Sequence, residues 1–312
     1  MKLRICWVLA IVAFALVPGH PRAANLTALV SFCALANCAD GMTPQGGVIA
    51  DAHGNLFGTT ISGGAHNGGT VFEIRKTRRG YASTPTILVD FCSLANCADG
   101  AAPSAGLIFD TDGNLFGTTR DGGANGGSFS GTVFEIAKIL GGYASTPTTL
   151  VSFCSPLPSC TLGAAPQASL IVDRKGNLFG TTTEGGANGR GTVFEIVKTA
   201  SGYASTPTTL VDFCSLADCA DGEGPVAGLI ADPKGNLFGT TNVGGANNAG
   251  VVFEVTDSGF VIFAGTPGKP SCLRKSVRAL ARQYGGLNAA AAALDYPNVP
   301  ALQNAISDFC EA

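Results

Sequence analysis

Short apolar runs separated by glycine-rich stretches recur along most of the chain. The sequence GNLFGTT occurs four times, beginning at Gly54, Gly113, Gly176 and Gly235. Leucine and phenylalanine are adjacent in each copy, so their side chains point to opposite faces of a strand. Both faces must therefore be covered by other parts of the protein. The pattern predicts buried central strands, one in each copy.

Each copy belongs to a larger unit that predicts four strands. The fourth unit contains GLIAD, GNLFGTT, VVFEV and FVIFAG, and an Asp-x-x-Gly-Asn step before the second strand is typical of a tight hairpin turn. The second copy has an extra Ser128-Phe129-Ser130, and the third has one extra residue between Cys154 and Cys160. Both insertions fall in predicted loops, where added length is tolerated.

Repeats of four short strands with buried central strands are typical of the blades of a β-propeller. The sequence therefore predicts an all-β, propeller-like fold with four tandem four-stranded repeats of about 60 residues each, plus a small C-terminal helical segment. A β-solenoid is the competing architecture, although its coils usually repeat at shorter periods.

The number of strands does not divide evenly among the units. Residues Thr27–Phe32 (TALVSF) match the last strand of a unit, as in ILVDF and TLVSF, yet the fourth unit has its own version at Phe260–Ala264. This gives four complete units and one spare strand. The spare strand either pairs across a ring closure or starts an incomplete fifth blade.

The block GLIADPKGNLFGTTNVGGANNAGVVFEV resembles the GloVer-type tandem repeat, found in a family of exported bacterial proteins with varied surface-anchoring tails. The resemblance recurs from about Ala28 to Gly265. It implies export and a propeller-like fold, and it implies no established activity and no catalytic residues. The sequence FCSLANCADG replaces a Gly-rich turn that is common in the family, and this departure adds cysteines.

Composition excludes some classes of function. The chain has a net charge of -3, only 13% charged residues and no extended basic cluster, so nucleic acid is not an expected partner. Three histidines and the absence of a GxSxG motif give little support to nucleophilic catalysis.

The N-terminus has the layout of a secretory signal peptide. Lys2 and Arg4 precede an apolar run from Ile5 to Val17, and Pro18 and Gly19 follow it. We assign residues 1–24 to this leader and leave its cleavage site open. An uncleaved membrane anchor is the alternative, but the run is short for the ~20 residues that span a bilayer. The expected location is secreted, periplasmic or at the cell surface.

The cysteines support export. Of eleven cysteines, removal of Cys6 with the leader leaves ten, an even number in an oxidising compartment. Local pairs within the loops are the simplest expectation, although pairing between repeats stays open. Zinc is a weaker alternative, because the spacing is unusual and no histidines accompany it. The expected disulfide residues are Cys33 and Cys38, Cys92 and Cys97, Cys154 and Cys160, Cys214 and Cys219, and Cys272 and Cys310.

The chain divides into the leader, a four-repeat domain over residues 25–266 and a helical tail over residues 267–312. In the tail, Val277, Leu280, Ala281 and Tyr284 follow helical spacing, and a second helix is predicted over Leu287–Leu294. A third helix is predicted from the apolar stripe of Leu302, Ala305, Ile306 and Phe309. Cys272 and Cys310 bracket the segment, so a bridge between them would close a small helical cap.

The Gly- and Asn-rich loops are the best candidates for a recognition face, since loops on a rigid scaffold commonly carry function. Their representative residues are Asn67, Asn125, Asn188 and Asn247. No catalytic residue, cofactor site or metal site is assigned: the start of a calcium loop in DTDGN is not repeated in the other copies, and the repeated Glu73, Glu135, Glu195 and Glu254 are more simply read as strand residues.

We therefore expect a non-catalytic binding or interaction module of the cell envelope or secreted fraction. Its partner would be an unknown polysaccharide or protein, with no membrane span after removal of the leader, and the chain would be a monomer. A carbohydrate-active hydrolase or lyase that uses acids near the propeller axis is one alternative. A structural envelope protein is another.

Overall fold

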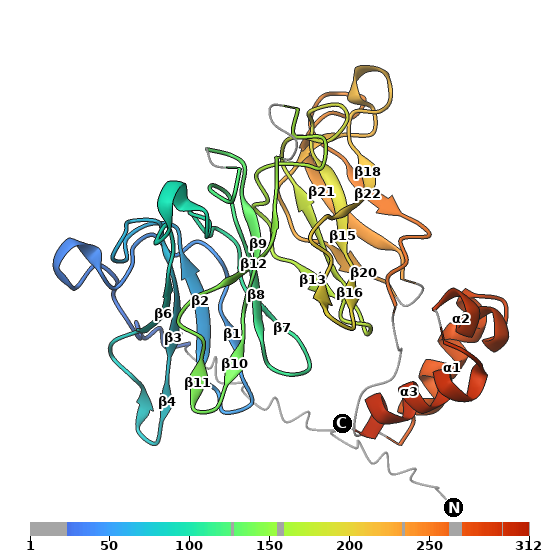
Figure 1. The fold of residues 1–312 in the computed structure, drawn as a ribbon, viewed down its shortest axis with the longest axis horizontal. Helices are drawn as coiled ribbons and strands as arrows, with labels where there is room; N and C mark the ends of the chain where they lie inside the picture. Colours follow the sequence, from blue (N-terminus) through green and yellow to red (C-terminus); the bar gives the residue numbers. More distant parts are fainter. Residues whose placement is uncertain are drawn as a thin grey trace, which may run out of the picture.

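The structure is a computed structural model that describes residues 24–125, 128–154, 159–232, 235–261, 270–294 and 296–311. Most of it consists of four antiparallel sheets arranged side by side in an arc, and three helices pack at the end of the arc (Figure 1). Residues 1–23 of the predicted leader lie outside the described residues.

Units 1 to 3 share one topology, in which four strands pair in an antiparallel sheet. In unit 1 these are β1 (Ile49–Ala50), β2 (Leu56–Thr60), β3 (Thr70–Ile74) and β6 (Thr86–Asp90). In unit 2 they are β7 (Ile108–Phe109), β8 (Leu115–Thr119), β9 (Thr132–Ile136) and β12 (Thr148–Ser152), and in unit 3 they are β13 (Ile171–Val172), β14 (Leu178–Thr182), β15 (Thr192–Ile196) and β18 (Thr208–Asp212).

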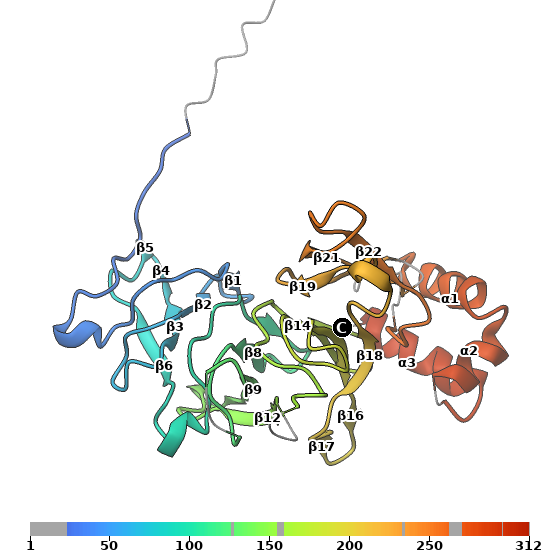
Figure 2. The ribbon, with the colours of Figure 1, turned by 90° about the horizontal axis from the view of Figure 1, so that it is seen from above.

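A small two-stranded hairpin precedes the last strand of each of these units. The hairpins are β4 (Lys76–Thr77) with β5 (Gly80–Tyr81), β10 (Lys138–Ile139) with β11 (Gly142–Tyr143), and β16 (Lys198–Thr199) with β17 (Gly202–Tyr203). Within each unit the first strand lies toward the inside of the arc and the last strand on its outer side, as the order from β1 to β6 shows in Figure 2. This is the strand order of a propeller blade.

Unit 4 differs from the others. It contains β19 (Glu223–Pro225), β20 (Ile230–Ala231), β21 (Leu237–Val243) and β22 (Val252–Val255), and β21 pairs with the other three. Among the described residues, β22 has no second partner equivalent to β6, β12 or β18. The four sheets therefore form a propeller-like arc that is not closed.

The repeated GNLFGTT motif forms the second strand of every unit, as the sequence predicts. The Asp turn before it is held by the aspartate: Asp51 Oδ1 accepts hydrogen bonds from the amides of His53 and Asn55, both at 2.9 Å. Gly54 has a φ of 81°, a conformation that glycine adopts without steric cost. The central glycine has another role, because a Cβ on Gly58 would lie 2.7 Å from the ring of Phe72 on the paired strand.

The hydrophobic core lies between units. Residues Phe116, Val133, Val151 and Phe153 of unit 2 pack on Leu170, Leu178, Phe194 and Ile196 of unit 3, and the other two junctions use equivalent residues. This packing buries both faces of the second strand in units 2 and 3, β8 and β14, which explains the adjacent Leu and Phe of the motif.

The structure corrects the prediction of a last strand in unit 4 over Phe260–Ala264. Ala264 lies outside the described residues, and the described Phe260 and Val261 are not in a strand. Phe260 instead stacks on Phe179 of unit 3 with ring centroids 5.0 Å apart, as Tyr203 stacks on Phe116 of unit 2. Phe260 thus takes the place of the hairpin tyrosine, and unit 4 is not complete in the described residues.

The tail contains α1 (Cys272–Gln283), α2 (Leu287–Ala293) and α3 (Val299–Glu311). Leu280, Leu294, Leu302 and Ile306 form a core of their own that also includes Val261. The disulfide between Cys272 and Cys310 links the first and last of these helices. The expected third stripe included Phe309, whose side chain lies outside the described set.

Candidate functional site

Two kinds of loop meet on one side of the arc, which we call the loop face. The disulfide loop that precedes each unit contacts the Gly-rich loop between the second and third strands of that unit. The contact is a backbone hydrogen bond that recurs four times at 2.9 Å, from the amides of Gly64, Gly123, Gly186 and Gly245 to the carbonyls of Cys38, Cys97, Cys160 and Cys219. The structure therefore brings the expected cysteines and the expected recognition loops together.

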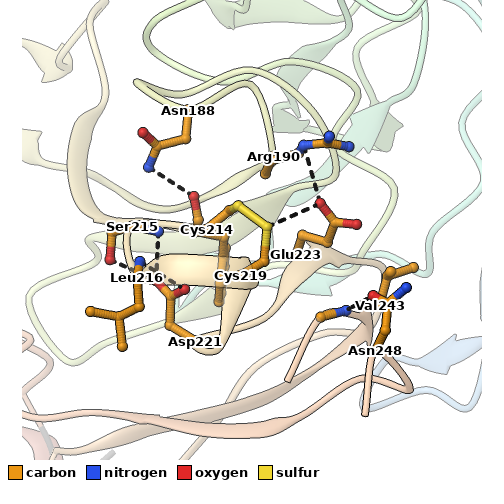
Figure 3. The surroundings of a disulfide bond; sticks show 12 residues. Asn188, Arg190, Cys214, Ser215, Leu216, Cys219, Asp221, Glu223, Val243 and Asn248 are labelled. Carbon is orange, nitrogen blue, oxygen red and sulfur yellow. Dashed lines mark hydrogen bonds and ion pairs between the residues drawn. A yellow bond between two sulfur atoms is a disulfide. The ribbon is translucent and has the colours of Figure 1, made fainter. Parts of the chain in front are cut away.

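The disulfide loops are tightly constrained. Cys33 pairs with Cys38, Cys92 with Cys97, Cys154 with Cys160 and Cys214 with Cys219, so each bridge is local. Three of the loops contain a short 3-10 turn, named η1 (Ala36–Cys38), η2 (Ala95–Cys97) and η3 (Ala217–Cys219). In the loop shown in Figure 3, Asp221 accepts hydrogen bonds from the amides of Ser215 and Leu216 at 2.8 and 3.2 Å.

Three of these constrained loops each hold an apolar side chain exposed to solvent. Leu35, Leu94 and Leu216 occupy equivalent positions in three disulfide loops, and each is 58–59% exposed. The amide of each leucine donates to an aspartate, Asp40, Asp99 or Asp221, at 3.2 Å. One exposed leucine is ordinary, but the same rigid presentation three times makes the loop face suited to contact with another molecule.

A cluster of metal-ligand atom types occurs at the fourth disulfide loop. Ligand atoms of Cys214, Cys219 and Glu223 lie within 4.8 Å of one another. Both sulfur atoms are used in the disulfide, so neither offers the thiolate that a metal requires. Glu223 also pairs with Arg190 at 3.1 Å (Figure 3). The residues present do not fit a metal site.

The four expected recognition asparagines have different environments. Asn125 and Asn188 each donate a 3.0 Å hydrogen bond to a backbone carbonyl, that of Phe153 or Phe213. Asn67 accepts from the amide of Gly63 at 3.1 Å. Asn247 is exposed. Its neighbour Asn248 accepts a hydrogen bond from the amide of Gly244, which is equivalent to the bond that Asn67 accepts. Three of the four asparagines thus shape the loops themselves.

Unit 2 carries the most distinctive part of the loop face. A cavity of about 340 Å³ is lined by Asn96, Cys97, Ala101, Asp121, Gly122 and Ser128. Beside it, Arg120 Nη2 and Asp121 Oδ2 are 2.8 Å apart, and the amide of Phe129 donates to Asp121 Oδ1 at 2.8 Å. The Arg120 guanidinium lies 5.4 Å from the centre of the Phe129 ring, which is 47% exposed.

The electrostatics of this cluster favour a fixed charge pair. The hydrogen bond to Asp121 raises the pKa of Arg120, while burial opposes the rise. Arg120 therefore stays protonated, and its planar group is held against the phenyl ring. Asp121 lines the cavity, and Arg120 and Phe129 lie next to this carboxylate. An aromatic face, a guanidinium and a carboxylate together can bind a ligand with both apolar and hydroxyl surfaces.

Phe129, Arg120 and Asp121 were not expected as site residues. The sequence feature that points to them is the insertion Ser128-Phe129-Ser130, which interrupts the repeat in unit 2 alone. The insertion was interpreted as added loop length, because sequence did not place Phe129 beside Arg120.

The opposite side of the arc carries the Asp turns and a cavity of about 260 Å³ lined in part by Asp110, Asp173, Lys175 and Lys198. Lys198 Nζ lies 3.8 Å from Asp110 Oδ2. Burial raises the pKa of Asp173 to about 6, against the effect of hydrogen bonds from Asn177, Val261 and Lys175.

The repeated glutamates do not line the inside of the arc. They lie on the third strand of each unit, so the first and second strands separate them from the inner edge of the sheet. Glu73 pairs with Arg75 at 3.1 Å, and Glu254 accepts from Asn236 at 3.0 Å. Burial, followed by the charges of Asp110 and Asp173, raises the pKa of Glu135 and Glu195 respectively.

None of the helices in the described part of the chain is both long enough and apolar enough to cross a membrane.

The repeat and the arc of blade-like sheets define a class of protein, the propeller-like tandem-repeat proteins. Within that class, the chain belongs to the Gloeobacter/Verrucomicrobia repeat family, whose profile matches residues 15–215 and 92–264. This confirms the family indicated by the sequence. No curated protein matches the chain.

Similarities to solved structures are distant. A periplasmic gluconolactonase from Pseudomonas aeruginosa is 18% identical with a TM-score of 0.35, over 59% of this chain and 46% of that one. A protein of unknown function from Dyadobacter fermentans is 10% identical with a TM-score of 0.42, over 70% and 67%. An endo-arabinase from Bacteroides thetaiotaomicron is 13% identical with a TM-score of 0.34, over 67% and 72%. The chain thus spans less than half of the gluconolactonase.

Proposed function

We propose that this protein is an exported, non-catalytic binding module that holds a polysaccharide on the loop face of unit 2, beside Phe129. The observation that carries the proposal is the exposed Phe129 ring next to the Arg120–Asp121 pair and the cavity of about 340 Å³. Sugar rings present an apolar face and a rim of hydroxyls, which suit an aromatic ring and fixed charged hydrogen-bonding groups respectively.

Export is supported by five disulfides, because such bonds persist in oxidising compartments. The proposed location is the periplasm, the cell surface or the medium. The N-terminal apolar run fits a leader that would direct the chain there.

A non-catalytic role is favoured over a hydrolase or lyase by the state of the acids. Asp121 is engaged by Arg120 and by the amide of Phe129, and Glu73 is paired with Arg75. A glycosidase needs one acid that is protonated and a second that is free to act across the bond. The structure gives no support for such a pair of acids at the cavity beside Phe129.

A protein ligand is the second candidate. The equivalent, exposed Leu35, Leu94 and Leu216 favour it, because exposed apolar groups on rigid loops are suited to protein contacts. This surface would extend along the arc, whereas the Phe129 cavity belongs to unit 2 alone.

The test is a screen of the purified protein against bacterial and plant polysaccharides that records both binding and release of shortened sugars. Phe129→Ala should weaken polysaccharide binding at least about tenfold, as the loss of an aromatic hot spot does. Leu140→Ala, an exposed apolar residue on the opposite hairpins, is the matched control and should bind normally.

Equal binding by Phe129→Ala and the parent protein would exclude the proposed site. Release of new reducing or unsaturated ends would replace the module with an enzyme. Loss of binding in Leu94→Asp with no effect of Phe129→Ala would favour the leucine surface.

A further inference from the structure

Each of the three junctions between units is built from the same two faces. The leading unit contributes a phenylalanine and a valine from its second and third strands, and a valine and a phenylalanine from its last strand and the residue after it. The following unit contributes residues such as Leu107, Leu115, Phe134 and Ile136, which meet Phe57, Val71, Val89 and Phe91 at the first junction.

The two ends of the arc leave these faces uncovered. Val252 of unit 4 is 80% exposed, whereas its equivalents Val71, Val133 and Val193 are fully buried. At the other end, Val48 of unit 1 is 54% exposed, whereas Leu107, the equivalent in unit 2, is buried. Unit 4 thus presents half of a junction, and unit 1 presents the complementary half.

The N-terminal segment supplies a last strand, which unit 4 lacks among its described residues. Thr27–Phe32 (TALVSF) aligns with Thr86–Phe91 (TILVDF), so Val30 and Phe32 correspond to Val89 and Phe91. The segment Phe260–Ala264, which sequence matched to the same pattern, lies partly outside the described residues, and its described residues Phe260 and Val261 are in no strand. The N-terminal segment would thus complete the face that a leading unit uses at every other junction. That face would consist of Phe238, Val252, Val30 and Phe32.

The ring of Phe32 already packs on unit 1 as the ring of Phe91 packs on unit 2. The Phe32 ring lies 4.8 Å from that of Phe72 in unit 1, at an interplanar angle of 57°, and Phe91 lies 4.9 Å and 59° from Phe134 at the first junction. The preceding residues, Thr27–Ser31, are in no strand. The segment is therefore anchored on the uncovered face of unit 1, where the last strand of a preceding unit would lie.

We propose that a second copy of this chain docks its unit 4 on unit 1 and that β22 of the second copy pairs with Thr27–Ser31. The register of β3 with β6 pairs Val71 with Val89 and Phe72 with Ile87. By the same register, Val252 of the second copy pairs with Val30, and Phe253 with Ala28. The exchange is made in both directions, so two chains close a ring of eight units.

The occupant is a second copy because the junctions are alike and leave the arc open. A threonine hydroxyl bonds to a carbonyl of the next unit at each junction, from Thr59 to Ala105, Thr118 to Ala168 and Thr181 to Ala227. Four units joined in this way leave an opening between unit 4 and unit 1 (Figure 2). Closing the ring within one chain would have to bring unit 4 across this opening onto unit 1, whereas docking of a second copy would repeat the contacts of the existing junctions.

A head-to-tail contact of this kind forms a ring when its rotation closes, and eight units lie within the range of known propellers. The proposed dimer differs from the monomer expected from sequence, and the oligomeric state decides between them.

Subunit mixing tests the proposal. Val30→Asp blocks the exchanged strand, and Val252→Asp blocks the strand that receives it. Native mass spectrometry of the purified chain should show a dimer, and each variant alone should show half that mass. An equimolar mixture should form a one-to-one heterodimer, because one junction then joins an intact β22 to an intact N-terminal segment.

Leu140→Asp is the matched control, since the Leu140 side chain is fully exposed at a hairpin turn, and it should stay dimeric. Far-UV circular dichroism establishes that each variant retains its strands. A parent chain that is monomeric at all concentrations, or a mixture of folded variants that forms no heterodimer, would overturn the proposal. An open series of larger oligomers would also overturn the closed ring.

Discussion

The hydroxyl of Thr59 in unit 1 donates a 2.7 Å hydrogen bond to the carbonyl oxygen of Ala105, which lies just before the first strand of unit 2. The equivalent bonds of Thr118 and Thr181 join the later units at 3.1 and 3.4 Å. The bonds of Thr59 and Thr118 are buried and that of Thr181 is partly buried. They join sheets whose four strands do not pair with one another across the junction. The second-strand threonines therefore fix how one unit sits on the next.

The first prediction concerns Thr118. Thr118→Val keeps the shape of the side chain but leaves the Ala168 carbonyl without its donor, so the free energy of unfolding should fall by about 1–3 kcal/mol. Thr148→Val, at an exposed strand position, should change it by less than about 0.5 kcal/mol. Urea unfolding of both variants measures the difference. An equal effect at the two positions would contradict the structural role of the junction bond.

The second prediction concerns the central glycine of the motif. A Cβ on Gly180 would lie 2.6 Å from the ring of Phe194 and 2.8 Å from Leu170 of the same unit. Gly180→Ala should therefore destabilise the protein by about 1–3 kcal/mol through overpacking. Gly142 has nothing within 4 Å of its Cβ position, so Gly142→Ala is the control. Thermal unfolding that ranks the two variants in the opposite order would refute this account.

The third prediction separates two of the loop asparagines. Asn188→Ala removes a bond to the Phe213 carbonyl and should cost about 1 kcal/mol. Asn247 is exposed, and Asn247→Ala should be close to neutral in stability. Chemical denaturation tests both variants. If the polysaccharide screen finds a ligand, a loss of affinity in Asn247→Ala without loss of stability would assign Asn247 to recognition.

The fourth prediction is a pH dependence with opposite signs at two equivalent turns. Burial raises the folded-state pKa of Asp173 to about 6, above its unfolded value. The stability associated with protonated Asp173 is present below about pH 4 and is lost as the pH rises through 6. The parent protein should therefore lose stability relative to Asp173→Asn between pH 4 and 7, by about 3 kcal/mol.

Asp51 provides the contrast. Burial tends to raise its pKa, but the hydrogen bonds from Asn55 and His53 prevail and lower it. The parent protein should therefore lose stability relative to Asp51→Asn as the pH falls below about 4. Unfolding midpoints measured from pH 3 to 7 test both slopes. Slopes of the same sign for the two variants would contradict the assignment of opposite shifts.

The fifth prediction compares a long and a short disulfide. Cys272 and Cys310 are 38 residues apart, whereas Cys92 and Cys97 are 5 apart. On the chain-entropy model, removal of the long bridge should cost about 4 kcal/mol and removal of the short one about 2 kcal/mol. Cys272→Ala/Cys310→Ala should lower the melting temperature of the helical signal first, because the tail helices have their own core. Equal losses in the two double variants would argue against this model.

Much of the architecture follows from the order of residues. The fourfold GNLFGTT motif determined the number of units, because adjacent apolar residues on a strand require cover on both faces. The Asp and Gly of each turn determined where the strands reverse, and the short spacing of the loop cysteines favoured local bridges. The helical spacing of Val277, Leu280 and Tyr284 likewise indicated α1. These are local properties, and they do not depend on the placement of distant parts.

Only the tertiary structure decided the relationships between units. Sequence similarity assigned Phe260 to a last strand, but packing on Phe179 gives it the place of a hairpin tyrosine. The position of Phe129 over Arg120 depends on how an inserted loop folds, which the repeat does not encode. The uncovered Val252 and the anchored Phe32 depend on the rotation between sheets. That rotation is the sum of many side-chain contacts across the junctions, so no single motif specifies it.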